Sequence, residues 1–203
     1  MSQRVTNIVL TATIAIGLGV AGVATMAQAS QRDKPVRVAI RDVQGTRIGT
    51  LAVVRKDGAR SRITVKVHHL APGYHGFHIH AVGLCDPKSV DPATGQVSPF
   101  FSAGGHLDLA PGGHSHPSHS GDMPPLLVRK DGTGSASFVT DRFRAAQLSD
   151  ADGSAVIVHA LPDNFSNIPD RYAPKGPDEA TLKTGDSGPR VACGAIKPIK
   201  APK

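Results

Sequence analysis

Two histidines separated by one residue are the first sign of chemistry in this sequence. His78 and His80 flank Ile79 in the run Gly76-Phe77-His78-Ile79-His80. In an extended strand alternate side chains share a face, so both imidazoles could bind a single metal ion. Phe77 and Ile79 favour a strand over a helix here. The pair alone is a modest signal for a metal site, because histidine pairs also occur on solvated surfaces.

The other histidines strengthen the metal interpretation. His106 follows Ala103-Gly104-Gly105, and His159 ends the apolar run Val156-Ile157-Val158. Between them lies a dense polar cluster with the residue types that bind zinc and copper, namely His114, His116, His119 and Asp122. Because so many candidate ligands are concentrated in this part of the chain, we expect a metal site.

The segments that must position these residues have the pattern of short β-strands. The candidates are residues 36–42, 47–54, 63–70, 77–82, 126–129, 135–140 and 155–159. Lys56-Asp57-Gly58 and Lys130-Asp131-Gly132 are typical tight turns between strands. No long helical pattern is present, and only residues 147–149 suit a short helical turn. Several short strands with such turns predict an all-β sandwich or barrel.

Two long segments interrupt the strands. Residues 85–125 are rich in Pro, Gly and His, and residues 163–189 are rich in Pro, Gly and charge. Loops of this length are usually functional or disordered. Both adjoin the candidate ligands, so we expect two functional loops.

The first 29 residues have the pattern of a secretory signal peptide. Arg4 precedes the apolar stretch Ile8 to Thr25, and Ala27-Gln28-Ala29 forms a cleavage site. Cleavage before Ser30 leaves residues 30–203, a length that suits one domain. A retained membrane anchor is the alternative, because the apolar run approaches the length of a spanning helix. We expect an exported protein, either extracellular or in the cell envelope or periplasm.

The chain is basic, with a formal net charge of +7. Such a charge favours anionic partners such as envelope surfaces, nucleic acid or a small anionic substrate. No basic stripe interleaved with aromatic residues is present, so we expect no nucleic-acid partner. The two cysteines, Cys85 and Cys193, form an even pair, which favours a disulfide in an exported protein.

Five motifs in chain order resemble the copper/zinc superoxide dismutase family. They are Gly76–His80, Ser102–His106, His119–Pro124, Val158–Ala160 and Gly188–Gly194. Residues 164–169 and 176–179 look most like the exported enzymes of actinobacteria. The resemblance covers almost all of the chain after the signal. It implies a flattened Greek-key β-barrel, an immunoglobulin-like sandwich in shape.

The resemblance also implies two adjacent metal sites. Copper would be held by His78, His80, His106 and His159, and zinc by His106, His119, Asp122 and a third histidine. His106 would bridge the two metals, and Asp163 would link a copper ligand to a zinc ligand from behind. The third zinc histidine is His116 or His114, and the actinobacterial pattern favours His116. Three further histidines have no motif partner and are interpreted as surface or strand residues: His68, His69 and His75.

The implied activity is the conversion of two superoxide ions to O2 and H2O2 by copper redox cycling, with zinc in a structural role. Arg190 would dock the anionic substrate, His106 would pass a proton, and Cys85 and Cys193 match the family's disulfide pair. The alternative is a non-catalytic copper-binding protein on the same scaffold. The sequence leaves open the choice between monomer and homodimer, zinc occupancy and association with the cell envelope.

Overall fold

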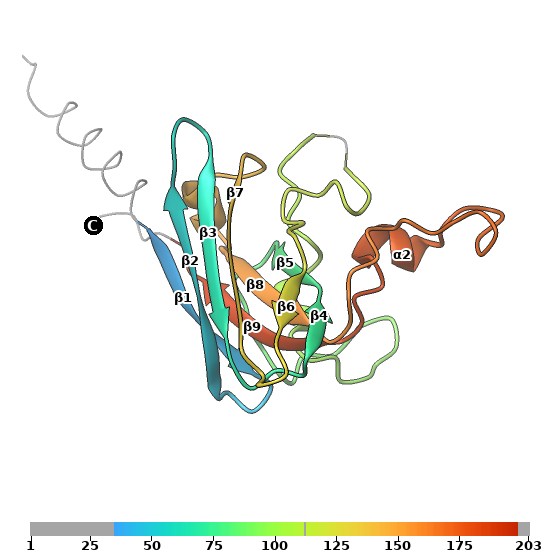
Figure 1. The fold of residues 1–203 in the computed structure, drawn as a ribbon, viewed down its shortest axis with the longest axis horizontal. Coiled ribbons are helices and arrows are strands. Elements are labelled where there is room, and N and C mark those ends of the chain that lie inside the picture. Colours follow the sequence, from blue (N-terminus) through green and yellow to red (C-terminus); the bar gives the residue numbers. More distant parts are fainter. Residues whose placement is uncertain (1–34, 112, 199–203) are drawn as a thin grey trace, which may run out of the picture. The chain divides into compact units, whose positions relative to one another are not determined.

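One antiparallel sheet dominates residues 35–111 and 113–198, which the computed structural model describes. Its nine strands follow the order β4-β6-β7-β3-β2-β1-β9-β8-β5 (Figure 1). The strands are β1 (Val36–Asp42), β2 (Arg47–Arg55), β3 (Ser61–Val67), β4 (Gly73–His75), β5 (Phe77–His80), β6 (Leu126–Val128), β7 (Gly134–Thr140), β8 (Ser154–His159) and β9 (Arg190–Ile196). Only Gly76 separates the two end strands, β4 and β5, in sequence. The sheet therefore curls into a nearly closed Greek-key barrel, and the predicted all-β fold is confirmed.

Three short helices accompany the barrel, namely η1 (Phe101–Ala103), η2 (Ala145–Ser149) and α2 (Glu179–Thr184). Helix α2 lies in the second long loop and has defined ends. The Asp178 carboxylate accepts a hydrogen bond from the Thr181 N–H, and Gly185 ends the helix with φ 59°. None of the helices in the described segments is long and apolar enough to cross a membrane.

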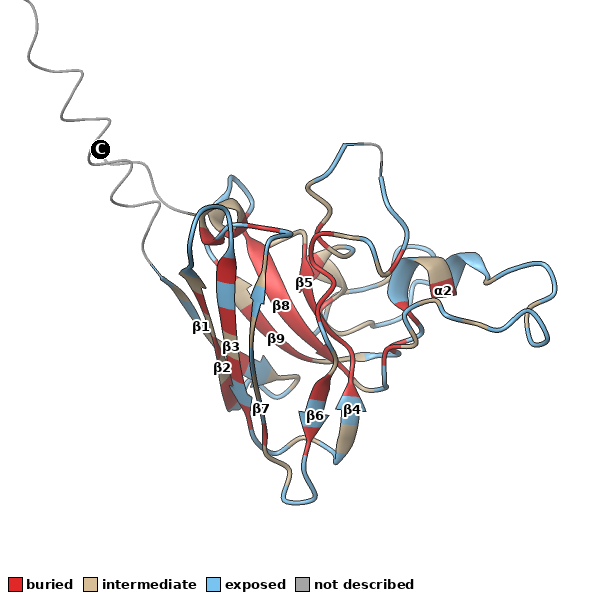
Figure 2. Ribbon diagram, turned by 45° about the horizontal axis from the view of Figure 1, so that its top comes forward, coloured by how far each residue is buried: buried red, intermediate tan, exposed pale blue. Residues whose placement is uncertain are grey.

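Strand β8 is buried on both faces, as Figure 2 shows along its whole length. Val156 and Val158 pack into the main core of the barrel. Ala155 and Ile157, on the opposite face, pack with Phe100 in a second apolar cluster. Because Phe100 belongs to the first long loop, that loop covers the outside of the barrel at this point.

The disulfide joins Cys85 to Cys193, as predicted, with the two Cα atoms 5.7 Å apart. It links the first long loop to β9. Both sulfur-bearing residues pack with the second apolar cluster, so the covalent link and the apolar contacts fix the same part of the loop.

Several predicted boundaries differ from the structure. The strand expected at 63–70 ends at Val67, and His69 adopts a positive φ of 61°. The strand expected at 77–82 ends at His80. The N–H groups of Ala81 and Val82 donate instead to loop carbonyls, those of Gly105 and Ala103. Strands β4 and β9 were not expected. The predicted signal peptide, residues 1–29, lies outside the described residues.

Candidate metal centre

The side chains of strand β5 alternate between the two faces of the sheet. Phe77 and Ile79 point into the main core. His78 and His80 therefore lie on the opposite face of the strand, and both are buried, at 0% and 1% exposure. The loops that cover this face thus enclose two imidazoles rather than apolar side chains.

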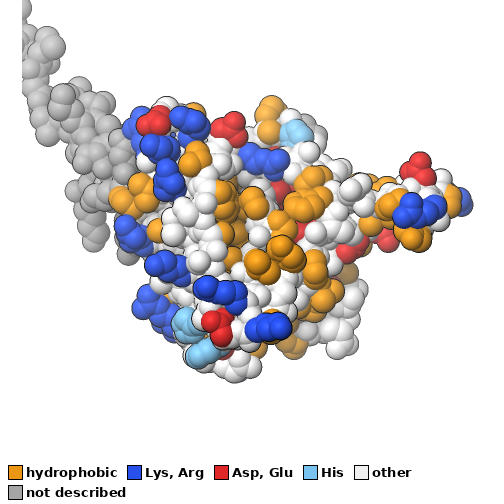
Figure 3. Space-filling view, in the orientation of Figure 1, with side chains coloured by type: hydrophobic (Ala, Val, Ile, Leu, Met, Phe, Trp, Pro, Cys, Tyr) orange, Lys and Arg blue, Asp and Glu red, His pale blue; other side chains and the backbone are white. Residues whose placement is uncertain are grey.

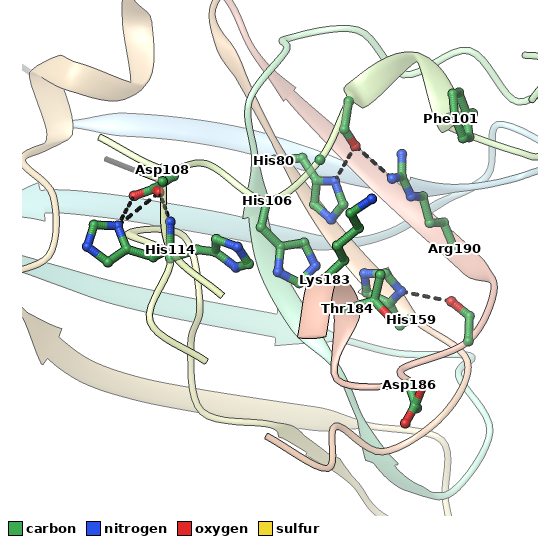
Figure 4. A pocket seen from close by; sticks show the side chains of 15 residues that line it. His80, Phe101, His106, Asp108, His114, His159, Lys183, Thr184, Asp186 and Arg190 are labelled. Atoms are coloured by element: carbon green, nitrogen blue, oxygen red, sulfur yellow. Dashed lines mark hydrogen bonds and ion pairs between the residues drawn. The ribbon is translucent and has the colours of Figure 1, made fainter. Parts of the chain in front are cut away.

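Four histidines meet beneath the loops, His78, His80, His106 and His159. Their ligand atoms all lie within 4.8 Å of one another. His106, in the first long loop, forms an isolated β-bridge with His80, and His159 ends β8 beside β5. Figure 4 shows three of the rings, those of His80, His106 and His159, converging on one cavity.

One nitrogen of each ring is held by a protein oxygen. His78 Nε2 lies 2.7 Å from Asp163 Oδ2, and His106 Nδ1 lies 2.7 Å from Asp122 Oδ1. The carbonyl partners are Gly104 O, 2.9 Å from His80 Nδ1, and Gly188 O, 3.0 Å from His159 Nδ1. The other nitrogens, Nδ1 of His78 and Nε2 of the remaining three, are buried without a hydrogen-bond partner. Unpaired buried polar atoms are rare in native proteins, so four of them in one cluster fit a bound copper ion.

A second cluster adjoins the first around the Asp122 carboxylate. Asp122 Oδ1 lies 2.7 Å from His106 Nδ1 and 3.1 Å from His116 Nδ1. Asp122 Oδ2 lies 3.1 Å from His119 Nδ1. Three imidazoles and one carboxylate form a donor set that suits zinc. His78 also falls within the 4.8 Å grouping of His106, His116 and Asp122, so the two clusters are contiguous.

The sequence left open whether His114 or His116 is the third histidine of the second cluster, and the positions of the two side chains differ clearly. His116 is buried in the second cluster, 2% exposed. His114 is exposed and turns to a different carboxylate, with its Nδ1 3.0 Å from Asp108 Oδ2. The structure therefore brings His116, and not His114, to the other candidate zinc ligands.

Asp163 connects the two clusters from behind. Its Oδ2 lies 2.7 Å from His78 Nε2, and its Oδ1 lies 2.7 Å from His116 Nε2. Burial raises the pKa of this carboxyl, but the hydrogen bonds from His116 and His78 outweigh burial and hold the pKa well below its usual range. Asp163 is thus an ionised acceptor that orients one ring in each cluster.

The four-histidine cluster opens onto a cavity of about 780 Å³ that also contains Arg190. The Arg190 guanidinium donates from Nη1 to Phe100 O at 2.6 Å and from Nη2 to Gly104 O at 2.7 Å. The Gly104 carbonyl also accepts a hydrogen bond from His80 Nδ1, so one backbone oxygen positions both the guanidinium and the imidazole (Figure 4). Burial lowers the pKa of Arg190 to about 10, which leaves the side chain cationic at neutral pH.

Comparison with known proteins agrees with this geometry. The sequence pattern of the family described as copper/zinc superoxide dismutase (SODC) matches residues 47–196. The chain belongs to the copper/zinc superoxide dismutase family. The family name implies copper and zinc, and the two clusters offer the imidazole and carboxylate donors that these metals bind.

Individual relatives in the family extend over different lengths. A superoxide dismutase [Cu-Zn] of Mycolicibacterium paratuberculosis is 51% identical over 132 residues, which are 63% of this chain and 57% of the relative. One from Escherichia coli K12 is 34% identical over 179 residues, 86% of this chain and 93% of the relative. The solved Cu/Zn superoxide dismutase of Brucella abortus is similar with a TM-score of 0.63, 29% identity, and coverage of 80% and 99% of the two chains.

Burial keeps three histidines of this superoxide dismutase family site neutral, namely His80, His106 and His159. It lowers the pKa of His106 to about 4, against the opposing effect of Asp122, and the pKa of His159 to about 3. The pKa of His80 is also well below its usual value, first through burial and then through Arg190. Because metal ions bind the deprotonated imidazole, these rings are in the binding form at neutral pH.

His116 shows the opposite shift. Burial lowers its pKa, but the hydrogen bonds and charges of Asp122 and Asp163 outweigh burial and raise the pKa to about 9. In the absence of metal this ring is therefore a cation between two carboxylates. A metal ion in the second cluster must displace that proton.

The contacts of three residues near the site were not anticipated from the sequence. Gly185 passes so close to the site that an added Cβ would lie 2.2 Å from Asp163 Oδ1 and 2.5 Å from His116 Nε2. The Arg142 guanidinium donates to the carbonyls of Pro117 and His119, at 2.8 and 3.0 Å. Arg142 thereby holds the backbone between two candidate zinc ligands. Of the three, only Gly185 carried a local signal, as the glycine after a short helix.

His75 is the third of these residues. It was interpreted as a surface or strand residue, and it lies in strand β4 but is only 3% exposed. Its Nδ1 lies 2.6 Å from His159 O, and its Nε2 lies 2.8 Å from Ala71 O. His75 therefore braces the backbone of a candidate copper ligand from inside the barrel.

Proposed function

We propose that this protein is an exported superoxide dismutase that converts two superoxide ions and two protons to O2 and H2O2. The observation that carries the proposal is the cluster of four unpaired imidazole nitrogens, three of them on rings that line one cavity beside the Arg190 cation. The activity is a proposal for this chain because the match spans only 57% of the mycobacterial relative's length.

The chemistry of the donor sets supports the proposed distribution of the two metals. Copper would be held by His78, His80, His106 and His159, because imidazole nitrogens suit copper. Zinc would be held by His106, His116, His119 and Asp122, a closed set of the structural type. Copper, when bound, supplies one-electron redox chemistry.

Arg190 would bind and orient the substrate. Two backbone carbonyls fix its guanidinium at the cavity, and the guanidinium retains further N–H donors for an anion. A fixed positive charge raises the rate of encounter with superoxide and holds the ion in one orientation. Lys183 lines the same cavity, with its amine paired to the Glu179 carboxylate.

His106 would supply a proton during turnover. Its Nδ1 contacts Asp122, while its Nε2 faces the four-histidine cluster without a partner. A proton held at Nε2 is within the cavity, where reduced oxygen must be protonated. Water would supply the second proton needed for H2O2.

Export is the second part of the proposal. It is supported by the pattern of residues 1–29, which leaves residues 30–203 as the mature domain. The Cys85–Cys193 disulfide is typical of oxidising compartments. Both a monomer and a homodimer, free or associated with the cell envelope, are compatible with this location.

The decisive experiment combines metal analysis with a superoxide assay on purified residues 30–203. We expect turnover to rise in proportion to copper content, to vanish on chelation and to return on reloading. A protein with copper and zinc sites fully loaded but without turnover would favour the alternative, a non-catalytic copper-binding protein.

A further inference from the structure

The outer surface of β1, β2 and β3 carries an unusual concentration of positive charge. We call it the cationic face and define it by five exposed residues on these strands: Arg37, Arg41, Arg47, Arg62 and Lys66. Figure 3 shows Lys and Arg side chains gathered over the side of the molecule that carries these strands. None of the five lines the metal-site cavity.

The strand register places Arg37 and Lys66 among small and hydroxyl-bearing side chains, and Arg62 between Val54 and Val139. Across the sheet, Arg37 pairs with Ala52, Ala52 with Thr64, and Thr64 with Ser137. The next outward row runs from Ala39 through Thr50 and Lys66 to Ser135. Neighbouring strands lie about 4.8 Å apart and alternate residues about 7 Å apart along a strand. The face therefore presents a lattice of cations and hydroxyl groups without a carboxylate in either row.

The charge of this face is not neutralised within the described part of the chain. None of its five cations is in an ion pair there. The nearby Asp42 carboxylate accepts two backbone N–H groups of its own turn, and Asp57 pairs with Lys56 and Arg60.

Two of the cations also oppose each other. Arg41 and Arg47 are direct cross-strand partners. Like charges in that position destabilise a sheet. A bound anion would relieve this repulsion.

We infer that the cationic face binds an acidic polysaccharide, a polymer of carboxylate-bearing sugars. The Arg guanidinium matches a carboxylate in a bidentate fashion. The hydroxyl groups of Thr50, Thr64, Ser135 and Ser137 lie in the same rows as Arg37 and Lys66 and suit the hydroxyl groups of a sugar. An extended polymer can contact several cations of the lattice at once, so weak single contacts add up.

Two other polyanions fit the face less well. A membrane-surface site needs large apolar or aromatic side chains beside the cations. Single-stranded nucleic acid needs aromatic side chains on which bases stack. The outward rows contain no aromatic residue, and the apolar side chains larger than Ala beside the cations are limited to Val54 and Val139, the cross-strand partners of Arg62.

The test compares two triple variants that lose the same charge. The face variant carries Arg37→Ser, Arg62→Ser and Lys66→Ser, and the control carries Lys88→Ser, Arg171→Ser and Lys175→Ser at exposed loop positions. With immobilised polygalacturonate as the probe, we expect the face variant to bind about tenfold more weakly and with a smaller salt dependence. The control should stay within about threefold of the wild type. Metal content and superoxide turnover should not change in either variant, so the result is independent of the proposed activity.

A footprint on the wild-type protein tests the same contact without a substitution. Free polygalacturonate should protect the Lys66 amine from acetylation and leave Lys88 reactive. Equal loss of binding in the two triple variants, or equal protection of the two lysines, would overturn the proposal. Tighter binding, at matched charge, to duplex DNA, to phosphatidylglycerol vesicles or to polyglutamate would also overturn it, by assigning the face to another polyanion.

Discussion

At the level of single residues, hydrogen bonds determine which nitrogen of each candidate copper ligand is free. A carbonyl oxygen can only accept, so His80 and His159 must carry their proton on Nδ1 against Gly104 O and Gly188 O. Their Nε2 lone pairs then face the cluster. Asp163 imposes the opposite tautomer on His78, whose Nδ1 faces the cluster. The surrounding oxygens thus prepare the binding tautomers before a metal arrives.

Single substitutions should separate the two metals. His80 belongs only to the four-histidine cluster, whereas His78 also touches Asp163 and through it His116. His80→Ala should therefore deplete copper and abolish turnover while zinc stays bound. Asp122→Ala should chiefly deplete zinc and lower stability, with some copper-dependent turnover left. Metal analysis after reloading measures both effects, and unchanged zinc content in Asp122→Ala would contradict the zinc assignment.

Arg190 should affect turnover more than metal binding. Arg190→Glu removes the docking charge, so we expect at least about a tenfold loss of turnover, or about 1.4 kcal/mol in the barrier. Arg190→Lys keeps the charge but loses the two-pronged contact with Phe100 O and Gly104 O, so its loss should be smaller.

Arg171→Glu provides the matched control for this charge reversal. Arg171 is exposed and does not line the cavity. Its substitution should leave turnover near the wild-type rate. Full turnover in Arg190→Glu with both metals bound would remove Arg190 from the mechanism.

At the level of elements, the close approach of Gly185 to the centre can be tested with a second glycine. Gly185 has φ +59° and no room for a Cβ beside Asp163 and His116, whereas Gly58 has φ +60° and open space. Both alanine variants carry backbone strain of about 1–2 kcal/mol. Gly185→Ala adds a steric clash of about 1–3 kcal/mol. We expect urea unfolding to show the larger loss for Gly185→Ala, together with weaker zinc retention. Equal losses in the two variants would contradict a role for close packing.

Local patterns predicted some elements and not others. Strand β5 was recognised because its apolar and histidine positions alternate, and five family motifs identified most candidate ligands. Strand β9 was missed because its sequence, with Ala192, Gly194 and Ala195, lacks both alternation and a run of strand-forming residues such as the Val156-Ile157-Val158 of β8. The contacts of Arg142 and His75 were not predictable, because their partners are backbone carbonyls whose positions depend on the folded loops. Sequence motifs thus indicate the residues that bind, and the tertiary fold supplies those that support them.

At the level of the whole molecule, the disulfide should contribute to both stability and turnover. Cys85 and Cys193 are 108 residues apart, and an ideal closure of that length stabilises by about 4–5 kcal/mol. The double variant Cys85→Ser, Cys193→Ser should therefore lower the free energy of unfolding by about 2–5 kcal/mol. Asp86, next to Cys85, bonds to Phe100, whose carbonyl holds Arg190. Turnover per bound copper should fall as well, and an unchanged rate would show that the loop is held without the disulfide.

The histidine pKa values predict how the stability of the metal-free protein depends on pH. In the folded protein the pKa values of His106 and His159 are about 4 and about 3, below the ordinary value of 6.5. Below pH 6.5 the unfolded chain therefore binds more protons than the folded protein, so stability should fall with acidification. The pKa of His116 is about 9 in the folded protein, above the ordinary value of 6.5. Between pH 6.5 and 9 the folded protein therefore binds more protons than the unfolded chain, so stability should fall as the pH rises. Urea unfolding of chelator-treated protein should show a maximum near pH 6.5. Stability that rises steadily from pH 6.5 to 9 would contradict the cationic His116.

The way the sheet ends has a consequence for self-association. An open strand edge is a template on which other chains can add strands and aggregate. Here the end strand β4 has only three residues. The other end strand, β5, is bridged on its outer side by loop residues, with His78 opposite Asp122 and His80 opposite His106. The loops that assemble the candidate metal centre therefore also shield the backbone of β5 from strand addition by neighbouring molecules.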